Sequence, residues 1–463
     1  MKKILVFLVI SFTLFASGRE KRISEVFPVE PGADIIFETI SGMDIEIVGS
    51  PNSEVVFDLT LDFDSSDKDY EKRFMEDFEI IELKKSGVHK FKFSKTDEDG
   101  GWNFFDLFKL KFSYYENISL RGTITIPENA KFTSDFRYGD IILTGLKNEI
   151  ILKGKGNELK IFNCLNLKKI ENAYGGVDLS DCGGDLRLNT RSDDVKVNFF
   201  EGNLTIDADY SDIKVSSVAG DLSIKSRSAE IRVENISGTA KIHSDYSDIN
   251  LSSIAVLTEV KSRSGTLLID KGELHKVITS YMEIDLRNIA NPEEVDLYIE
   301  NKSGTIRLDR VTSHIKIVDQ YSDLTFLKVK GNLDISSRSG SIIGDEVEGN
   351  IISNTQYSSL EFRKLSADKI LIKNRSNPVE LELNNLPSVI DIDNEYGGAY
   401  IKLKVKFGGK IKLYSTYGEI ETNLPYKVVE QSSSQNLMEI VEGGKSDVII
   451  KTRSGDIEFY ELN

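Results

Sequence analysis

The sequence predicts an all-β fold, a right-handed parallel β-helix (solenoid) with coils of about 18 residues. The first observation is a fixed period of 36 residues that separates the tyrosines Tyr138, Tyr174, Tyr210 and Tyr246. The series continues less strictly through Tyr281, Tyr321, Tyr357 and Tyr396. A period that covers most of a chain is typical of repeat architectures, in which each unit buries its apolar face only by stacking on its neighbours.

The second observation is the pattern of apolar residues within each period. Leu204 and Ile206 alternate with polar residues, the phase then shifts, and Ile213 and Val215 follow; the same pattern returns 18 residues later. Short strands joined by tight corners, each pairing with its equivalent in the next coil, describe a parallel β-helix. A leucine-rich horseshoe would carry an asparagine signature and helical stretches, and a propeller would need antiparallel blades of about 40 residues.

The chain is expected to divide into four segments. Residues 1–18 read as a signal peptide, with Lys2 and Lys3 before a short apolar stretch and small residues at 16–18. Residues 19–130 form an N-terminal β-rich capping region, with strands expected near 34–40, 43–48, 55–61, 88–93 and 118–126 and one short surface helix within 66–78. Residues 131–424 form the β-helix. Residues 425–463 form a C-terminal cap with a hairpin around 432–436.

Composition narrows the class of partner. The formal net charge is −17, and an acidic excess repels polyphosphate and acidic lipid surfaces, so nucleic-acid binding is not expected. No segment of the mature chain has the length and apolar character of a transmembrane helix. The protein is therefore expected to be exported, to the periplasm, the cell surface or the medium.

The corner positions form two columns when the coils are aligned on their first apolar residue. Tyrosine then stacks on serine or glycine, as in Tyr210, Ser228 and Tyr246. Counting strand parity forward from Leu204 and Ile206 predicts that this column points inward, with large and small residues alternating along the axis. The preceding positions form an outward ladder of opposite charges that would fix the register, among them Arg191, Asp209, Arg227, Asp245 and Arg263.

Residues that could carry chemistry are few. Asp140, Asp212, Asp248 and Asp323 each follow a tyrosine by two residues, at a two-coil separation close to that of the carboxylates of inverting glycosidases. Aspartate is equally favoured by turn geometry at such corners. The four histidines share no coil position and have no metal-ligand or triad spacing. No cofactor or metal site and no catalytic residue is predicted.

Two further features leave alternatives open. Cys164 and Cys182 are 18 residues apart, which places them on adjacent coils in a core column, as two buried thiols or as a disulfide. The aromatic cluster of Trp102, Phe104 and Phe105 either caps the first coil or forms a contact with a partner.

Short motifs resemble a bacterial family of β-strand-repeat domains of unknown function, often labelled adhesins. They are Ile40–Ile47, Ile124–Ala130, the recurring Arg-Ser-Gly and Tyr-Ser-Asp corners, and the closing Thr452–Ile457. The resemblance covers nearly the whole mature chain, implies a cell-envelope location and implies no catalytic residues.

Three functions are consistent with these features. The first is a non-enzymatic envelope protein, a rigid acidic solenoid rod for adhesion or scaffolding that contacts a protein or polysaccharide of the envelope. The second is a polysaccharide-degrading β-helix enzyme, which would need long loops around a cleft, whereas the corner insertions here are short. The third is a structural spacer.

Overall fold

A computed structural model describes residues 15–16, 20–95, 117–432 and 435–462. Most of the expected signal peptide and the whole aromatic cluster of Trp102, Phe104 and Phe105 lie outside the described residues. The chain divides into two compact units, Met1–Gly238 and Thr239–Asn463. Each unit is an array of parallel coils, so the predicted parallel β-helix with a spacing of about 18 residues is confirmed.

Each coil of the solenoid contributes a strand to two long parallel sheets. We call the strands before the tyrosine or serine corner the first sheet and the strands after it the second sheet. A short third segment joins the second sheet to the first sheet of the next coil, as in β18 (Val218–Ala219). Equivalent residues pair in register, as Ile213 does with Ile231, so aliphatic side chains of successive coils stack inside and are buried.

The first unit begins with a β-rich region that joins the coils edge to edge. Its antiparallel strands are β2 (Glu20–Pro28), β5 (Glu54–Asp64), β8 (Asn117–Pro127), β6 (Phe78–Lys85) and β7 (Val88–Lys95). Parallel pairing already begins in β3 (Asp34–Ser41) and β4 (Met43–Ser50), which pair with the first coil. Phenylalanine rings fill this end of the core, where Phe37 and Phe57 each make an edge-to-face contact with Phe91.

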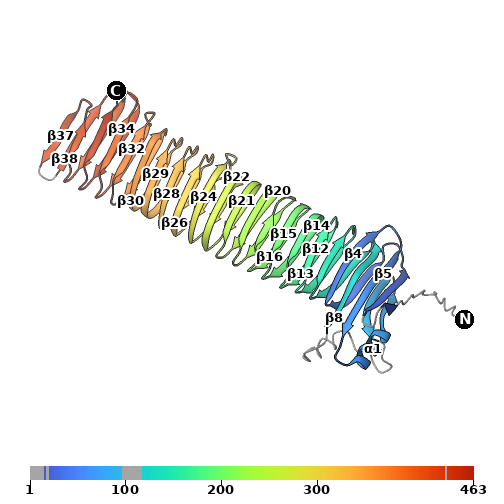
Figure 1. The fold of residues 1–463 in the computed structure, drawn as a ribbon. Helices are drawn as coiled ribbons and strands as arrows, with labels where there is room; N and C mark the ends of the chain where they lie inside the picture. Colours follow the sequence, from blue (N-terminus) through green and yellow to red (C-terminus); the bar gives the residue numbers. More distant parts are fainter. Residues whose placement is uncertain (1–14, 17–19, 96–116, 433–434, 463) are drawn as a thin grey trace. The chain divides into compact units, whose positions relative to one another are not determined.

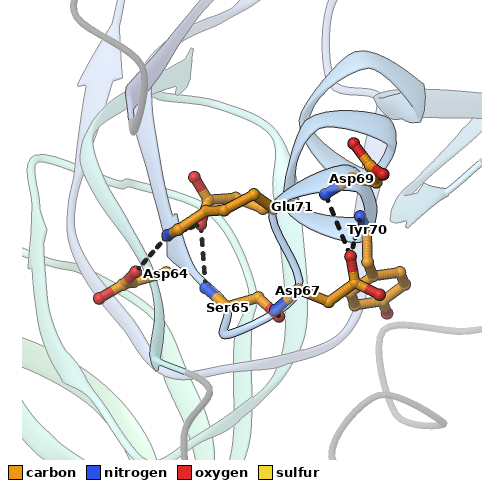
Figure 2. Close-up of polar contacts among 7 residues, drawn as sticks. Asp64, Ser65, Asp67, Asp69, Tyr70 and Glu71 are labelled. Carbon is orange, nitrogen blue, oxygen red and sulfur yellow. Dashed lines mark hydrogen bonds and ion pairs between the residues drawn. The ribbon is translucent and has the colours of Figure 1, made fainter.

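One short helix, α1 (Lys68–Asp77), lies beside β5, where the sequence predicts a surface helix. Asp67 is its N-cap, and its carboxylate accepts hydrogen bonds from the backbone N–H groups of Asp69 and Tyr70 (Figure 2). Glu71 on the first turn accepts from the backbone N–H of Ser65. These bonds satisfy N–H groups at and before the start of the helix and fix how the chain enters it.

The remaining strands of the first unit form its coils. In the first sheet lie β9 (Lys131–Arg137), β11 (Ile150–Lys155), β13 (Leu167–Ala173), β16 (Leu204–Asp209) and β19 (Leu222–Ser226). In the second sheet lie β10 (Asp140–Thr144), β12 (Glu158–Phe162), β15 (Val195–Glu201) and β17 (Ile213–Val215). The long strand β14 (Val177–Arg191) belongs to the second sheet in its first half and to the first sheet in its second half.

The second unit is likewise built from a first and a second sheet of stacked strands (Figure 1). Its first sheet holds β23 (Lys276–Ile278), β25 (Leu297–Glu300), β27 (Ile315–Val318), β31 (Lys369–Asn374), β33 (Val389–Asn394) and β35 (Gly409–Ser415). Its second sheet holds β22 (Ser264–Leu274), β24 (Tyr281–Ile289), β26 (Ser303–Asp309), β28 (Tyr321–Leu327), β32 (Val379–Leu383), β34 (Ala399–Leu403) and β36 (Ile420–Thr422). The strands β21 (Asp248–Lys261), β29 (Leu333–Asp345) and β30 (Ile351–Leu365) contribute to both.

The C-terminal segment folds back into the solenoid. After β36, a hairpin of β37 (Lys427–Ser432) and β38 (Gln435–Val441) covers β35 in antiparallel pairing (Figure 1). The chain then returns as β39 (Ser446–Thr452) and β40 (Ile457–Glu461), which insert between two coils that precede them in sequence. β39 pairs in parallel with β33 on one side and β35 on the other, and β40 pairs with β34 and β36. The last coil in sequence is therefore not the last coil in space.

Candidate interaction surface

The tyrosines of the corner column lie on the surface of both units, and the prediction that they point inward is wrong. Their side chains are between 44% and 65% exposed. The first unit carries three of them and the second unit six; they are Tyr138, Tyr174 and Tyr210, and Tyr246, Tyr281, Tyr321, Tyr357, Tyr396 and Tyr417. We call each set the tyrosine column of its unit.

The error has a physical reason in the backbone of the corner. Tyr138, Tyr174, Tyr210 and Tyr246 have φ values of 56°, 63°, 58° and 40°, in the left-handed region that ends a β-strand. The two-residue alternation therefore breaks: Ala208 is buried, Asp209 and Tyr210 both face outward, and Ser211 is buried again. If the alternation of buried and exposed residues is continued forward from β16, the ring of Tyr210 is placed inside. If it is continued backward from Ile213, the ring is placed outside, as observed.

The stacking of tyrosine on small residues is confirmed by the strand register. Tyr281 pairs with Ser264 on one side and Ser303 on the other, and Ser303 pairs with Tyr321. In the first unit the ring of Tyr138 lies over the α-carbon of Gly156, where a β-carbon would come within 2.8 Å of a ring atom. The small residue of each intervening coil thus makes room for a ring that covers the outer surface.

The alternation persists where the chain order changes. The inserted strand β39 places Ser454 between Tyr396 and Tyr417, as the pairing of Thr452 with Asn394 and Ser415 shows. In sequence these two tyrosines belong to consecutive coils, yet in space a serine coil separates them. The column of the second unit therefore keeps one tyrosine on every second coil up to Tyr417.

Basic side chains stand beside the rings. The guanidinium groups of Arg263, Arg338 and Arg453 lie 5.6, 5.8 and 5.7 Å from the ring centroids of Tyr246, Tyr321 and Tyr396, and Lys155 Nζ lies 5.7 Å from that of Tyr174. These are cation–π distances. Arg263 also donates a hydrogen bond of 2.9 Å to the Tyr246 hydroxyl, and this bond raises the pKa of Arg263.

The expected charge ladder is present in part. Arg191 forms an ion pair of 3.8 Å with Asp209, and Glu395 lies 3.7 Å from both Arg375 and Arg453. These side chains are largely exposed, so each pair contributes little to the free energy of unfolding. Arg263 instead contacts a tyrosine. The ladder thus mixes ion pairs with ring contacts.

Buried polar side chains support the corners from inside. The position two residues before the column holds Asn301, Asp319 and Asn374, among others, and all three are buried. The Asn374 amide donates to the backbone carbonyl groups of Ser376 and Ser358, at 2.7 and 2.9 Å. The Asp319 carboxylate accepts from the backbone N–H of Ser322. These bonds satisfy backbone N–H and carbonyl groups of the corner that are not paired between strands, and they hold the corner in one conformation.

The aspartates that follow the tyrosines also take part in corner geometry. Asp248 Oδ1 accepts from the backbone N–H and the hydroxyl of Thr266 on the next coil, at 3.0 and 2.8 Å. Asp323 Oδ1 does the same with Ser341, at 2.8 and 2.9 Å. This pattern matches the turn role of aspartate.

The other candidate residues do not gather into a site. Cys164 and Cys182 are free, buried thiols, and burial raises the pKa of Cys164 to about 12 and that of Cys182 to about 11. His89 is fully buried between Glu30 and Glu82, at 2.5 Å from each. Within the described ranges no group of three or more His, Cys, Asp or Glu could hold a metal ion, and no helix there is long and apolar enough to cross a membrane.

The comparison with protein families gives one match. The family model described as Toastrack DUF4097 matches residues 89–287 and again 279–459. The chain belongs to the Toastrack family. Toastrack is a family of unknown function with a β-helix-like repeat, which agrees with the resemblance seen in the sequence motifs.

No curated protein matches this Toastrack chain. Among solved structures, a match is a candidate cell adhesion protein from Clostridium sporogenes, at 9% sequence identity and a TM-score of 0.15. The match covers 96% of this chain and 100% of that one.

Proposed function

We propose that this Toastrack protein is an exported, non-enzymatic protein of the cell envelope that uses its solenoid for adhesion or scaffolding. The observation that carries the proposal is the tyrosine column of the second unit, six exposed rings on one corner of alternate coils. Large exposed aromatic side chains in a regular row are typical of contact surfaces. The coils need no such ring for packing, because serine or glycine occupies the same corner in every second coil.

The remaining features support the same proposal. The first 18 residues have the pattern of a signal peptide, and the acidic composition favours solubility. Asp248 and Asp323 are two of the aspartates that a polysaccharide-degrading enzyme would use, and both bind corner groups of the neighbouring coil. Among the described residues no metal cluster stands near them.

The test is binding of the purified chain to envelope material from the cells that produce it. The wild-type chain is expected to co-sediment with washed envelopes. When the cells are fractionated, the exported chain is expected to be absent from the cytosolic fraction. The variant Tyr321→Ala/Tyr357→Ala is expected to remain in the supernatant. Tyr426→Ala is the matched control, since Tyr426 is 54% exposed but lies outside the column.

Three results would overturn the proposal. Equal sedimentation of both variants would show that the tyrosine column is not the contact surface. Release of new reducing ends from envelope polysaccharide, lost on changing Asp212 and Asp248, would identify the degrading enzyme instead. A chain that is exported and binds nothing would be the structural spacer.

A further inference from the structure

Along the tyrosine column of the second unit, aromatic and basic side chains alternate at a regular spacing, as the units of an extended polymer do. Rings stand on alternate coils and basic side chains on the coils between them. Successive coils are about 4.8 Å apart, so equivalent rings recur about every 10 Å along the column. The insertion of Ser454 between Tyr396 and Tyr417 preserves this period against the order of the sequence. A packing role for each corner alone does not require it.

The position before the column is basic on every serine coil of this unit. Its residues there are Arg263, Lys302, Arg338, Arg375 and Arg453, all exposed. On the tyrosine coils the same position holds two acids, Asp245 and Glu395, and otherwise uncharged residues. A chain with a net charge of −17 thus carries a net positive row directly beside its exposed rings.

The other side of the rings has the opposite character. Two residues after the tyrosines lie Asp248, Glu283, Asp323 and Glu419. Asp248 and Asp323 each use one oxygen, Oδ1, for the corner of the next coil, and a carboxylate has lone pairs for further hydrogen bonds. The surface is therefore ordered across its width as cations, ring faces and hydrogen-bond acceptors.

We propose that the tyrosine column of the second unit binds an extended acidic polysaccharide lengthwise, an inference that rests on the proposed envelope function. Sugar rings stack on the tyrosines. Their carboxylates pair with the arginine and lysine row, and their hydroxyl groups donate to the aspartate side. In an extended β-linked chain two sugar units advance about as far as two coils do, so each repeat of two sugars meets one tyrosine and one basic residue. Pairing with a second copy is disfavoured because each chain carries a net charge of −17.

The test uses β-linked polymannuronate oligosaccharides, from the disaccharide to the dodecasaccharide, in titration calorimetry with the purified chain. Affinity is expected to rise with length as more rings are engaged, and to fall when the salt rises from about 0.1 M to 1 M. Tyr321→Ala/Tyr357→Ala should weaken binding about tenfold or more, while Tyr321→Phe/Tyr357→Phe keeps the stacking face and should bind. Lys302→Gln/Arg338→Gln should lose affinity for the acidic chain.

Controls separate the inference from loss of folding and from the proposed function. Tyr426→Ala should bind as the wild type does, and unchanged thermal unfolding of each variant excludes a folding defect. A neutral cellulose oligosaccharide of equal length that binds as tightly as polymannuronate would overturn the assignment to an acidic ligand. Envelope binding that depends on the tyrosines but disappears after protease treatment of the envelopes would identify a protein ligand, which overturns this inference and leaves the proposed function standing. Absence of both envelope binding and polymannuronate binding in the wild-type chain would overturn both.

Discussion

Replacing Gly340 by alanine tests whether the Arg-Ser-Gly corner is required by backbone geometry. Gly340 has a φ of 135°, and an added β-carbon would lie 2.1 Å from the carbonyl oxygen of Ser322 on the adjacent coil. That distance is about 1.3 Å short of the 3.4 Å at which ordinary contact begins. The coils are held by strand pairing on both sides of this point, since Val318 pairs with Ser336 before it and Leu324 pairs with Ile342 after it. The clash therefore cannot be relieved without opening a ladder.

Two costs follow from that geometry. A backbone conformation that L-residues rarely adopt costs about 1 to 3 kcal/mol, and forcing an extra methyl group into a closed contact costs about 1 to 3 kcal/mol more. We expect Gly340→Ala to destabilise the second unit by about 2 to 6 kcal/mol. Because coils of a solenoid interact mainly with their neighbours, the loss should be greatest in the coils around 322–342.

The assay is urea unfolding followed by circular dichroism, with hydrogen exchange to locate the loss. Gly443→Ala is the matched control in the same unit, because no atom lies within 4 Å of its added β-carbon. It should change the unfolding midpoint little. Equal midpoints for Gly340→Ala and the wild type, with unchanged exchange at 322–342, would refute the reasoning that glycine is required by the close approach of the two coils.

Three further predictions concern the thiols, one carboxylate and the last coil. Cys164 and Cys182 should resist alkylation at mildly alkaline pH in the folded chain, since burial raises their pKa values to about 12 and 11; after denaturation without reductant a thiol assay should count two, and zero would contradict this. Burial would raise the pKa of Glu259, but hydrogen bonds from two lysines and a histidine outweigh it and lower the pKa to about 2 from 4.5. Its stabilising contribution should be present above pH 4.5 and be lost as the pH falls from 4.5 through 2, so the urea midpoint should drop over that range more in the wild type than in Glu259→Gln. Ending the chain after Leu424 removes the only strands described between β33 and β35, so hydrogen exchange at 409–415 should become fast; continued protection there would argue against the insertion.

The period of the sequence was sufficient to predict the β-helix, because stacked coils impose the same residue type at the same position. It also predicted that tyrosine lies on serine. It did not place the rings on the correct side, because a left-handed residue at the corner, as at Tyr138, Tyr174, Tyr210 and Tyr246, breaks the alternation that a strand carries forward. The residues after the corner indicate the correct side of the ring, because Ser211 and Ile213 are two residues apart and both face inward. Counting from both strands would have shown that two outward positions, Asp209 and Tyr210, are adjacent.

The insertion of the last coil could not be predicted from the repeat. Residues 446–461 follow the coil pattern, and a repeat that depends only on neighbouring contacts would place them after residue 424. The pairing of β39 depends instead on two partners that are already separated in space, which is a long-range condition. The spatial alternation of Tyr396, Ser454 and Tyr417 is visible only once this pairing is known.

The inserted coil also sets the order in which the end of the solenoid can form. Other coils of the second unit can add one after another as the ribosome releases them. The coil of β35 and β36 cannot reach its final position until residues 446–461 have been synthesised and have paired with β33 and β34. Closing a loop from β33 to β39 carries an entropic cost that neighbouring coils avoid, so this end is expected to be the slowest to complete. Once formed, it cannot unfold one coil at a time starting from β40, because β39 and β40 are each paired with strands on both sides.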